Sequence, residues 1–443
     1  MMMDADSKPK LLGPWMSMSM VVGYMIGSAI FLLPATLAPY GRNAFFAWGV
    51  TIGGTLCLAL AFSRLAAQNR GGPQAYMEQA FGADAAYYTM WIYWISVITS
   101  TAAIAVAFGG AISATFPGLF GPDWIVPLSL AAILVVTAIN VRGVHSAGEF
   151  QVATTLIKLL PLFAVMVVLA LRLSSGRPAE PLAPTPITGA GIAAASALML
   201  FSLVGFEAAT VAAGKTRDPE RIVPFATLGG TALTGLLYFF SCSAAMLLLP
   251  YATAANSRSP FADAIAPAWG SGVGQLIAAL TAVSAIGALN ASVLIQGEVG
   301  QVMARKGNLP RLLERGNSRL APVSSLIVTG VIAALFVSFN ASRTFVGLYV
   351  FITLISTVAS LVLYGAGAIA ALKLKLSPVI HWLVIAGVIY ALWTFYGAGL
   401  EACLWGLALL VAGWPIRLIS RRLNSSAAIP TAAAPAAPPE SSA

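Results

Sequence analysis

The sequence predicts an all-α integral membrane protein that crosses the bilayer about twelve times. Three observations predict this fold class. Only 9% of the 443 residues are charged and 59% are hydrophobic, whereas a soluble globular domain carries roughly 25% charged residues. The apolar residues gather into long runs, and a membrane helix needs about 20 such residues. The basic residues gather in alternate loops between these runs, as they do in multi-pass membrane proteins.

Twelve apolar runs follow one another along the chain and are joined by short loops. They lie near residues 13–38, 44–67, 86–115, 124–141, 149–173, 188–213, 223–250, 271–303, 323–340, 344–372, 378–397 and 400–418. No soluble domain is expected between them. No small-residue cleavage site follows the first run, so we do not interpret it as a signal peptide. The segment Ser425–Ala443 is rich in Ala, Pro and Ser, a composition typical of disorder.

The net charge of +9 reflects membrane topology rather than nucleic-acid binding. Most of the 24 lysines and arginines fall in the loops that are cytoplasmic if the N-terminus is inside. The opposite loops hold only Arg42, Arg172, Arg177, Arg258 and Arg343. This bias places both termini in the cytoplasm and favours an even number of spans.

Metal and nucleotide chemistry find no support in the sequence. Cys57, Cys242 and Cys403 all lie inside apolar runs without CxxC spacing, so we interpret them as small core residues. His145 and His381 are far apart in the chain, and no Walker loop is present. No cofactor and no metal site are therefore expected.

Two apolar runs contain glycine and small polar residues where the bilayer is driest. The first run holds Gly23–Phe31, followed by Pro34, and the sixth holds Phe201–Glu207. Taken alone, either segment could mark close packing between helices. The two segments occupy corresponding places if runs 1–5 and 6–10 are repeats, and paired interruptions of this kind indicate the binding site of a secondary transporter.

A helix that unwinds in mid-membrane leaves backbone N–H and C=O groups without partners. This is tolerated only where the groups line a cavity or meet a ligand. The N-terminus of the resumed helix attracts an anion, and the carbonyls that end the preceding helix attract a cation. Together they suit an α-amino acid, which carries both charges on one carbon.

Glu207 lies within the interruption of the sixth run. An ionisable side chain at mid-span is costly and is a functional candidate by default. The alternative is a structural hydrogen bond to the unwound backbone of the first run, and the two roles are compatible. Glu149 and Glu298 lie nearer the ends of their runs, so an interfacial role accounts for them.

Lys158 is the one basic residue deep within a span. The nearer end of its run is roughly 13 Å away at 1.5 Å per residue, so the side chain cannot easily reach the interface. A central lysine costs about 2.5–3.5 kcal/mol to insert. Lys158 is therefore a candidate proton acceptor, and the alternative is a fixed charge bonded to carbonyls of another helix.

The chain resembles the amino acid–polyamine–organocation superfamily, and within it the basic amino acid/polyamine antiporters typified by the arginine/agmatine antiporter. The similarity extends over about residues 12–420. The motifs that carry it are Gly27–Pro34, Gly71–Tyr76 with Ala80–Gly82, Phe201–Ala209 and Asp218–Pro224. The resemblance implies a LeuT-type 5+5 inverted repeat with discontinuous helices 1 and 6. The expected units are a cytoplasmic tail 1–11, five-helix repeats 12–173 and 187–373, helices 11 and 12 at 378–420, and a disordered cytoplasmic tail 424–443.

The resemblance also implies roles for individual residues. The amides around Ser28 and Ala29 would hold a substrate carboxylate, and the carbonyls of Met25, Phe201 and Val204 would hold its ammonium group. Glu207 matches the gating and proton-sensing glutamate of the family. The other residues expected to line the site are Gly27, Ser96, Val97, Thr101, Ser202 and Ser292.

Several positions depart from the arginine exchanger. Its tryptophans correspond to Phe201 and Ser292 here, and its asparagines correspond to Tyr24 and Thr101. A guanidinium group needs aromatic faces and acceptors, so arginine specificity does not follow from the resemblance. Lys158 matches a lysine of proton-coupled superfamily members that the arginine exchanger lacks.

The sequence thus predicts a secondary amino acid transporter that works by alternating access. Exchange of a cationic amino acid for its amine competes with proton-coupled uptake of a more neutral amino acid through Lys158. A membrane-embedded enzyme would need a polar catalytic cluster, and a channel would need charged rings or a filter motif; neither pattern is found. The expected location is the plasma membrane, the inner membrane of a bacterium. The expected partners are a small amino acid or amine, protons if transport is proton-coupled, lipid and, as an open alternative, a second copy in a homodimer.

Overall fold

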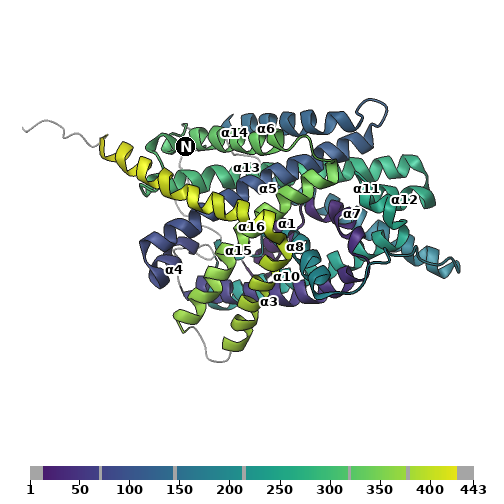
Figure 1. Ribbon diagram of the computed structural model, residues 1–443, viewed down its shortest axis with the longest axis horizontal. Helices are drawn as coiled ribbons and strands as arrows, with labels where there is room; N and C mark the ends of the chain where they lie inside the picture. The colour runs from purple at the N-terminus through teal and green to yellow at the C-terminus, as the bar shows by residue number, and fades with distance from the viewer. Residues whose placement is uncertain are drawn as a thin grey trace, which may run out of the picture.

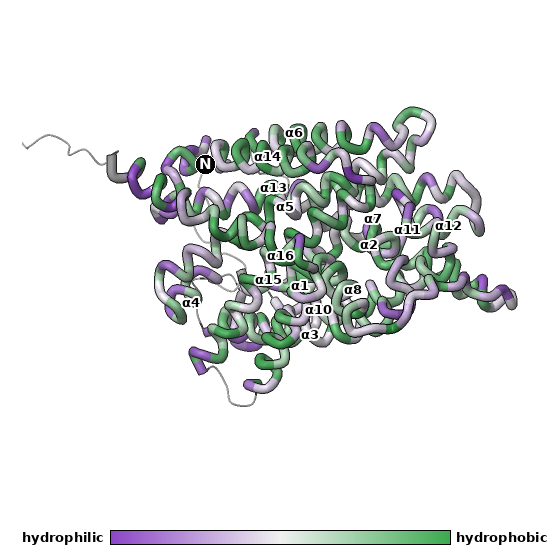
Figure 2. Tube along the Cα trace, viewed as in Figure 1, coloured by the Kyte–Doolittle hydropathy of each residue, from purple (hydrophilic) through white to green (hydrophobic). Residues whose placement is uncertain are grey.

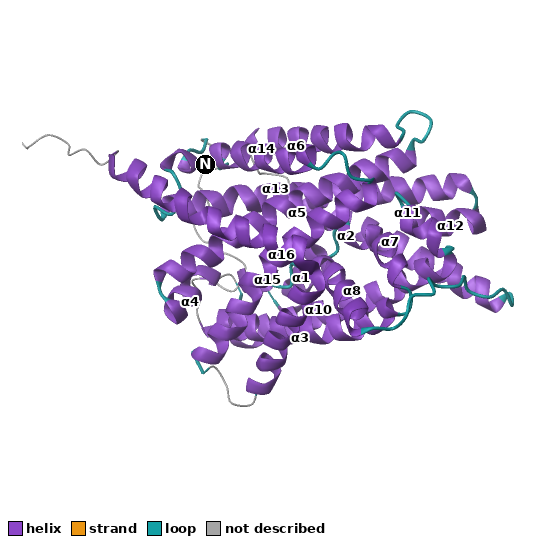
Figure 3. Ribbon diagram, viewed as in Figure 1, coloured by secondary structure: helices purple, strands orange, loops and turns teal. Residues whose placement is uncertain are grey.

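The fold is described from a computed structural model covering residues 13–68, 72–142, 147–211, 216–317, 321–375 and 380–426. Helices joined by turns and loops make up these residues, and they contain no strand element (Figure 3). The predicted tails 1–11 and 427–443, together with Gly71 and His145, lie outside the described residues. Residues 424–426, expected in the disordered tail, are helical and end the last helix.

Most helices are long rods that lie roughly along one direction (Figure 1). The helices in the regions of the predicted runs, of which α2 and α9 are short, are α1 (Pro14–Met25), α2 (Ala29–Leu37), α3 (Asn43–Gln68), α5 (Ala83–Thr115), α6 (Ile125–Arg142), α7 (Ala147–Ser174), α8 (Gly189–Leu203), α9 (Ala208–Val211), α10 (Pro219–Leu248), α13 (Ser271–Arg305), α14 (Val323–Phe339), α15 (Phe345–Lys373) and α16 (His381–Ser426). The positions of these helices follow the twelve predicted runs closely.

Eight of the described helices are long and apolar enough to cross a membrane, or nine if α1 and α2 form one bent span. The apolar helices α8 and α14 are shorter. In α16, Gly399 has φ 83° and ψ 163°, so it divides the helix at the boundary predicted between the last two runs. This left-handed conformation is open to glycine because it has no Cβ. The chain is a multi-pass membrane protein.

The sequence did not predict several short helices outside the spans. They are α4 (Gly72–Phe81), α11 (Tyr251–Asn256), α12 (Pro260–Trp269) and the 3₁₀ helices η1 (Ala38–Tyr40), η2 (Pro122–Trp124) and η4 (Arg311–Glu314). None is long enough to span a bilayer, which needs about 20 residues. We therefore expected these segments to be loops.

Local sequence explains where several helices begin. Proline occupies the first helical position of α1, α10 and α12, where no N–H is needed and its fixed φ suits a helix. Thr188 caps α8 by accepting a hydrogen bond from the N–H of Gly191 at 3.0 Å. Thr344 caps α15 in the same way, and such caps stabilise a helix by about 1 kcal/mol.

Large apolar side chains cover the outside of the bundle. Phe339 on α14 is 80% exposed, and Leu134 on α6 and Leu233 on α10 are also exposed. Figure 2 shows hydrophobic residues along the lengths of α6 and α14 and hydrophilic ones gathered mainly near helix ends and in loops. Lipid is the natural solvent for such a surface, because a soluble monomer rarely exposes large continuous apolar patches.

The buried core forms two large clusters. One includes residues of α1, α2, α3, α8 and α10 and contains Met25, Trp48 and Tyr238. The other includes residues of α5, α6, α13 and α14 and contains Trp94 and Leu289. The helix α15 contributes to both clusters. In Figure 1, α6 and α14 lie side by side along α5 and α13.

Candidate functional site

The first predicted interruption is present between α1 and α2. The helix α1 ends at Met25 and α2 begins at Ala29, with a bend of 50° between them. Ser28 is the N-cap of α2, yet its side chain makes no capping hydrogen bond. Its hydroxyl is buried and has no hydrogen-bond partner among the described residues. A helix N-terminus with an unused hydroxyl therefore faces the space left by the break.

The second interruption lies between α8 and α9. The helix α8 ends at Leu203, and residues 204–207 form a turn before α9 begins at Ala208. Gly205 has φ +112°, a backbone conformation that other residues rarely adopt. The turn thus needs glycine at this position to stop α8 in the middle of the bundle.

The two interruptions touch each other. A Cβ atom on Gly205 would lie 2.5 Å from Cδ1 of Tyr24 and 3.7 Å from the Cα of Met25. The end of α1 therefore packs directly against the turn that follows α8.

One pocket opens beside both breaks. Its volume is about 90 Å³. It is lined by Tyr24, Met25, Gly27, Ser28, Ala29, Tyr93, Ser96, Val97, Ser100, Ile104, Lys158, Phe201, Ser202, Val204, Glu207, Ala288, Ala291 and Ser292. Met25 belongs to one core cluster, and Ala29 and Phe201 belong to the other. The pocket therefore lies where the two clusters meet.

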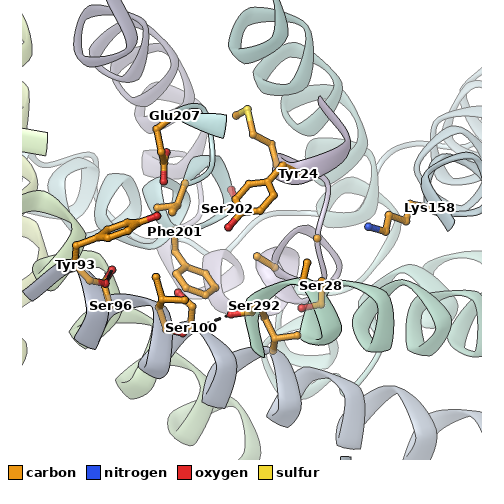
Figure 4. Close-up of a pocket in the computed structure, with 18 residues that line it drawn as sticks. Tyr24, Ser28, Tyr93, Ser96, Ser100, Lys158, Phe201, Ser202, Glu207 and Ser292 are labelled. Carbon is orange, nitrogen blue, oxygen red and sulfur yellow. Dashed lines mark hydrogen bonds between the residues drawn. The ribbon is translucent and has the colours of Figure 1, made fainter. Parts of the chain in front are cut away.

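Glu207 and Lys158 lie on opposite sides of the pocket (Figure 4). One carboxylate oxygen of Glu207 accepts hydrogen bonds from the N–H of Gly205 at 3.1 Å and from the hydroxyl of Tyr364 at 3.0 Å. The Glu207 side chain is thus tied to the turn of its own break and to α15. This structural hydrogen bonding was predicted as one of its two roles, although the partner is the sixth-run backbone rather than the first.

Lys158 reaches the pocket from α7 and points toward Ser28 (Figure 4). The whole residue is only 1% exposed. No carboxylate among the described residues forms an ion pair with it. An amine buried without a counterion is costly when charged, and this cost is lower when it is neutral.

Comparison with known proteins decides the family. The family model described as "Amino acid permease" matches residues 12–433. This match covers nearly the whole chain.

The chain belongs to the amino acid permease family.

Curated relatives agree with this assignment. The putrescine transporter PotE of Escherichia coli K12 is 26% identical over 418 residues, which is 90% of this chain and 94% of PotE. The cadaverine/lysine antiporter of the same strain is 30% identical over 334 residues, 73% of this chain and 74% of the antiporter. PotE of Haemophilus influenzae is 26% identical over 406 residues, 88% of this chain and 93% of that protein. The permease is therefore a transporter rather than an enzyme, in the basic amino acid/polyamine antiporter branch.

Most of the residues that the sequence singled out line the pocket of the permease. The exception is Thr101, which does not line the pocket but contacts the lining residue Ser292. Its hydroxyl is 2.8 Å from the hydroxyl of Ser292 and 2.9 Å from Oε1 of Gln296. Thr101 follows Ser100 directly on α5, and neighbouring residues on a helix face different directions.

Sequence reasoning missed six lining residues: Tyr24, Tyr93, Ser100, Ile104, Ala288 and Ala291. A helical signal could have found most of them. Residues three and four apart share one face of a helix. Tyr93 and Ser100 are related in this way to the predicted Ser96 and Val97, and Ala288 is four residues from Ser292. Ile104 is seven residues from Val97, about two helical turns along the same face. The spacing does not find Ala291, which directly precedes Ser292.

Metal chemistry finds no site in the part of the permease that the structure describes, where no three His, Cys, Asp or Glu side chains come together. Hydroxyl groups, backbone carbonyls, the amine of Lys158 and the carboxyl group of Glu207 instead surround the pocket. Such groups can bind and orient a small zwitterion.

Proposed function

We propose that the permease is a secondary amino acid transporter that works by alternating access and holds its substrate between the two broken helices. The observation that carries this proposal is the common pocket of the two breaks, with the unpartnered Ser28 hydroxyl at the start of α2. Paired broken helices are the usual architecture of a transporter site at mid-membrane.

The substrate carboxylate belongs at the N-terminus of α2. The amides of Ser28 and Ala29 begin this helix, whose positive dipole end attracts an anion. The Ser28 hydroxyl adds a donor, because it has no partner among the described residues. The backbone at Gly27 leaves space for the substrate. A Cβ added there would meet only the Cβ of Ala288 at 3.7 Å and the carbonyl oxygen of Met25 at 3.9 Å.

The substrate ammonium belongs at the end of α8. The carbonyl of Met25, predicted as one of its ligands, already accepts hydrogen bonds from the Tyr238 hydroxyl and the Gly27 N–H, both at 2.8 Å. A carbonyl oxygen has two lone pairs, so Met25 has no free acceptor site in this state. We therefore place the substrate ammonium group at the carbonyls of Phe201 and Val204, which flank Ser202 in the chain.

The arrangement of helices supports alternating access. If runs 1–5 and 6–10 are repeats, α5 and α6 correspond to α13 and α14. These four helices share one core cluster, and the helices of runs 1, 2, 6 and 7 share the other. A pocket between two such bodies can open to either side when one moves against the other.

The finer topology is part of the same proposal. It comprises twelve spans, repeats at 12–173 and 187–373, helices 11 and 12 at 378–420, and both termini in the cytoplasm. The bacterial relatives and the distribution of basic residues support an inner-membrane location with this orientation.

Two modes of transport remain in competition. The relative named as a cadaverine/lysine antiporter favours exchange. Lys158 is buried beside the first break and has no ion-pair partner among the described residues, which favours proton-coupled symport. In that mode a charged Lys158 would hold the carbonyls of the first break and a neutral one would release them.

Uptake into proteoliposomes tests the proposal and separates the two modes. Purified permease is reconstituted with or without internal alanine, and labelled alanine is added outside with or without an inward proton gradient. Exchange predicts uptake only into loaded vesicles, whereas symport predicts uptake into empty vesicles driven by the gradient. The proposal of amino acid transport fails if none of the common amino acids enters under either condition.

A further inference from the structure

Three serine hydroxyls, those of Ser96, Ser100 and Ser292, line the pocket on the side of α5 and α13. We propose that this surface selects a small uncharged amino acid whose side chain ends in a hydrogen-bond donor such as a hydroxyl. This inference rests on the proposed function and narrows it. It sets the permease apart from its relatives, which are named for diamines and lysine.

The hydroxyl protons on α5 are already used within the protein. Ser96 donates to the carbonyl of Tyr93 at 2.7 Å. Ser356 donates to the carbonyl of Ser96 at 2.9 Å. The contact of 2.8 Å between the hydroxyls of Ser100 and Ser356 must therefore use the proton of Ser100. Ser96 and Ser100 are thus left with lone pairs alone for the pocket.

Ser292 on α13 is placed in the same way. Thr101 has two acceptors for its one proton, the carbonyl of Val97 at 3.0 Å and Oε1 of Gln296 at 2.9 Å. With its proton on either of them, its oxygen accepts the proton of Ser292 across their 2.8 Å contact. All three serines then present acceptors and no free donor. A substrate group that donates a hydrogen bond satisfies them, whereas a methyl group leaves buried acceptors without a partner.

The same oxygens could accept from an ammonium group, but the charges of the pocket disfavour a second cation. Among the described residues that line the pocket, Lys158 is the one lysine or arginine and Glu207 the one carboxylate. One oxygen of Glu207 already receives two hydrogen bonds. A distal ammonium would therefore be buried without a counterion of its own, which is expensive in a membrane.

The size of the pocket agrees with this selection. Its volume is about 90 Å³, and it must hold the whole substrate, including the carboxylate and ammonium groups. A compact side chain such as that of serine or threonine fits this space better than an extended diamine or a lysine chain does.

Competition for alanine exchange tests the inference. The uptake of labelled alanine into alanine-loaded proteoliposomes is measured with one unlabelled competitor at a time. The competitors are serine and its isostere 2-aminobutyrate, threonine and its isostere valine, lysine, and putrescine. We expect serine and threonine each to compete roughly ten-fold better than the isostere, because the site hydrogen-bonds the hydroxyl. Lysine and putrescine should compete least.

Variants locate the effect in the serine surface. Ser100→Ala and Ser292→Ala should each bring the ratio between competition by serine and competition by 2-aminobutyrate toward one. Thr99→Ala removes a hydroxyl from the same helix that bonds only its own turn and does not line the pocket, so the ratio should persist. Equal competition by the isosteres, or preference for lysine or putrescine, overturns the inference while alanine exchange upholds the proposed function. A protein that takes up no common amino acid, either by exchange or with an inward proton gradient, fails the proposed function itself.

Discussion

At the residue scale, Glu207 joins the second break to the rest of the bundle. Its carboxylate accepts from Gly205 and Tyr364, so it both shapes the turn and carries a titratable proton. We predict that Glu207→Gln leaves the fold intact, because the amide oxygen can keep the two hydrogen bonds. The variant should lower the exchange rate about ten-fold, equivalent to ~1.4 kcal/mol, and flatten its pH dependence.

Exchange rates measured across a range of pH check this prediction, with Tyr364→Phe as the control. The phenylalanine variant removes one hydrogen-bond donor and leaves the carboxylate in place. It should therefore keep a pH dependence that Glu207→Gln loses. Wild-type rates at every pH for Glu207→Gln would exclude a protonic role for this residue.

Lys158 is the residue that distinguishes symport from exchange. It is buried at the first break without an ion-pair partner among the described residues, and its two protonation states differ strongly in solvation. A group can shift a conformational equilibrium only through such a difference between states. We predict that Lys158→Ala abolishes stimulation of uptake by an inward proton gradient while substrate binding survives.

Lys373→Ala is the matched control, because this lysine lies at the end of α15 over the ring of Phe81, away from the pocket. It should retain gradient-driven uptake. Retained stimulation in a well-folded Lys158→Ala protein would leave Lys158 with a structural role at most.

The sequence identifies the pocket residues that are unusual in a membrane helix, but it does not identify every residue that lines the pocket. Glycine, serine and ionisable residues in mid-span stand out against an apolar background, so Ser28, Glu207 and Lys158 were found. Ser100 and Ile104 were not, because a small or apolar residue inside a membrane helix carries no signal of its own. The sequence also does not show that the Tyr238 hydroxyl on α10 donates a hydrogen bond to the Met25 carbonyl, because these residues are far apart in the chain.

At the scale of the element, the turn between α8 and α9 depends on a glycine. Gly205 combines a positive φ with close contact to the ring of Tyr24. We predict that Gly205→Ala costs about 1–3 kcal/mol from backbone strain alone, and more from the displaced ring. Transport should fall because the two breaks no longer fit together, which thermal unfolding and exchange measurements in parallel would show.

Gly53→Ala provides the comparison for this change. Gly53 lies within α3, and an added Cβ would meet nothing within 4 Å. Alanine should be tolerated or slightly stabilising there, since it has the higher helix propensity. Equal stability and transport for the two variants would mean that the turn does not require glycine.

The long apolar helices were predicted well because apolar length is a strong signal, whereas short helices were not. Nothing in the sequence distinguishes α4, α11 or α12 from loops, because these segments of 6 to 10 residues have mixed polarity. The breaks were the informative exceptions, because glycine and small polar residues in the bilayer centre conflict with a continuous helix.

At the scale of the whole molecule, the end of α16 is clamped to the start of α5. Arg417 forms an ion pair with Asp84 and stacks over the ring of Tyr87 at 4.5 Å. Tyr87 and Trp91 donate hydrogen bonds to the carbonyls of Gly413 and Leu409 at 2.7 and 2.8 Å. These contacts join the last helix to the second core cluster.

We predict that Arg417→Ala lowers stability by roughly 1–2 kcal/mol, from the lost cation–π contact and charged hydrogen bond. Exchange activity at low temperature should persist, because the clamp lies outside the pocket. Arg421→Ala is the matched control, since Arg421 lies 3.9 Å from the same carboxylate and is largely exposed. Equal melting temperatures for the two variants would show that the clamp adds no stability.

The central claim is that the two broken helices together hold the charged ends of one amino acid. A cryo-electron microscopy structure of the permease in lipid nanodiscs with serine tests it most directly. The account predicts the serine carboxylate at the amides of Ser28 and Ala29, and its ammonium group at the carbonyls of Phe201 and Val204. A continuous helix through residues 23–30, or serine bound away from both breaks, would contradict it.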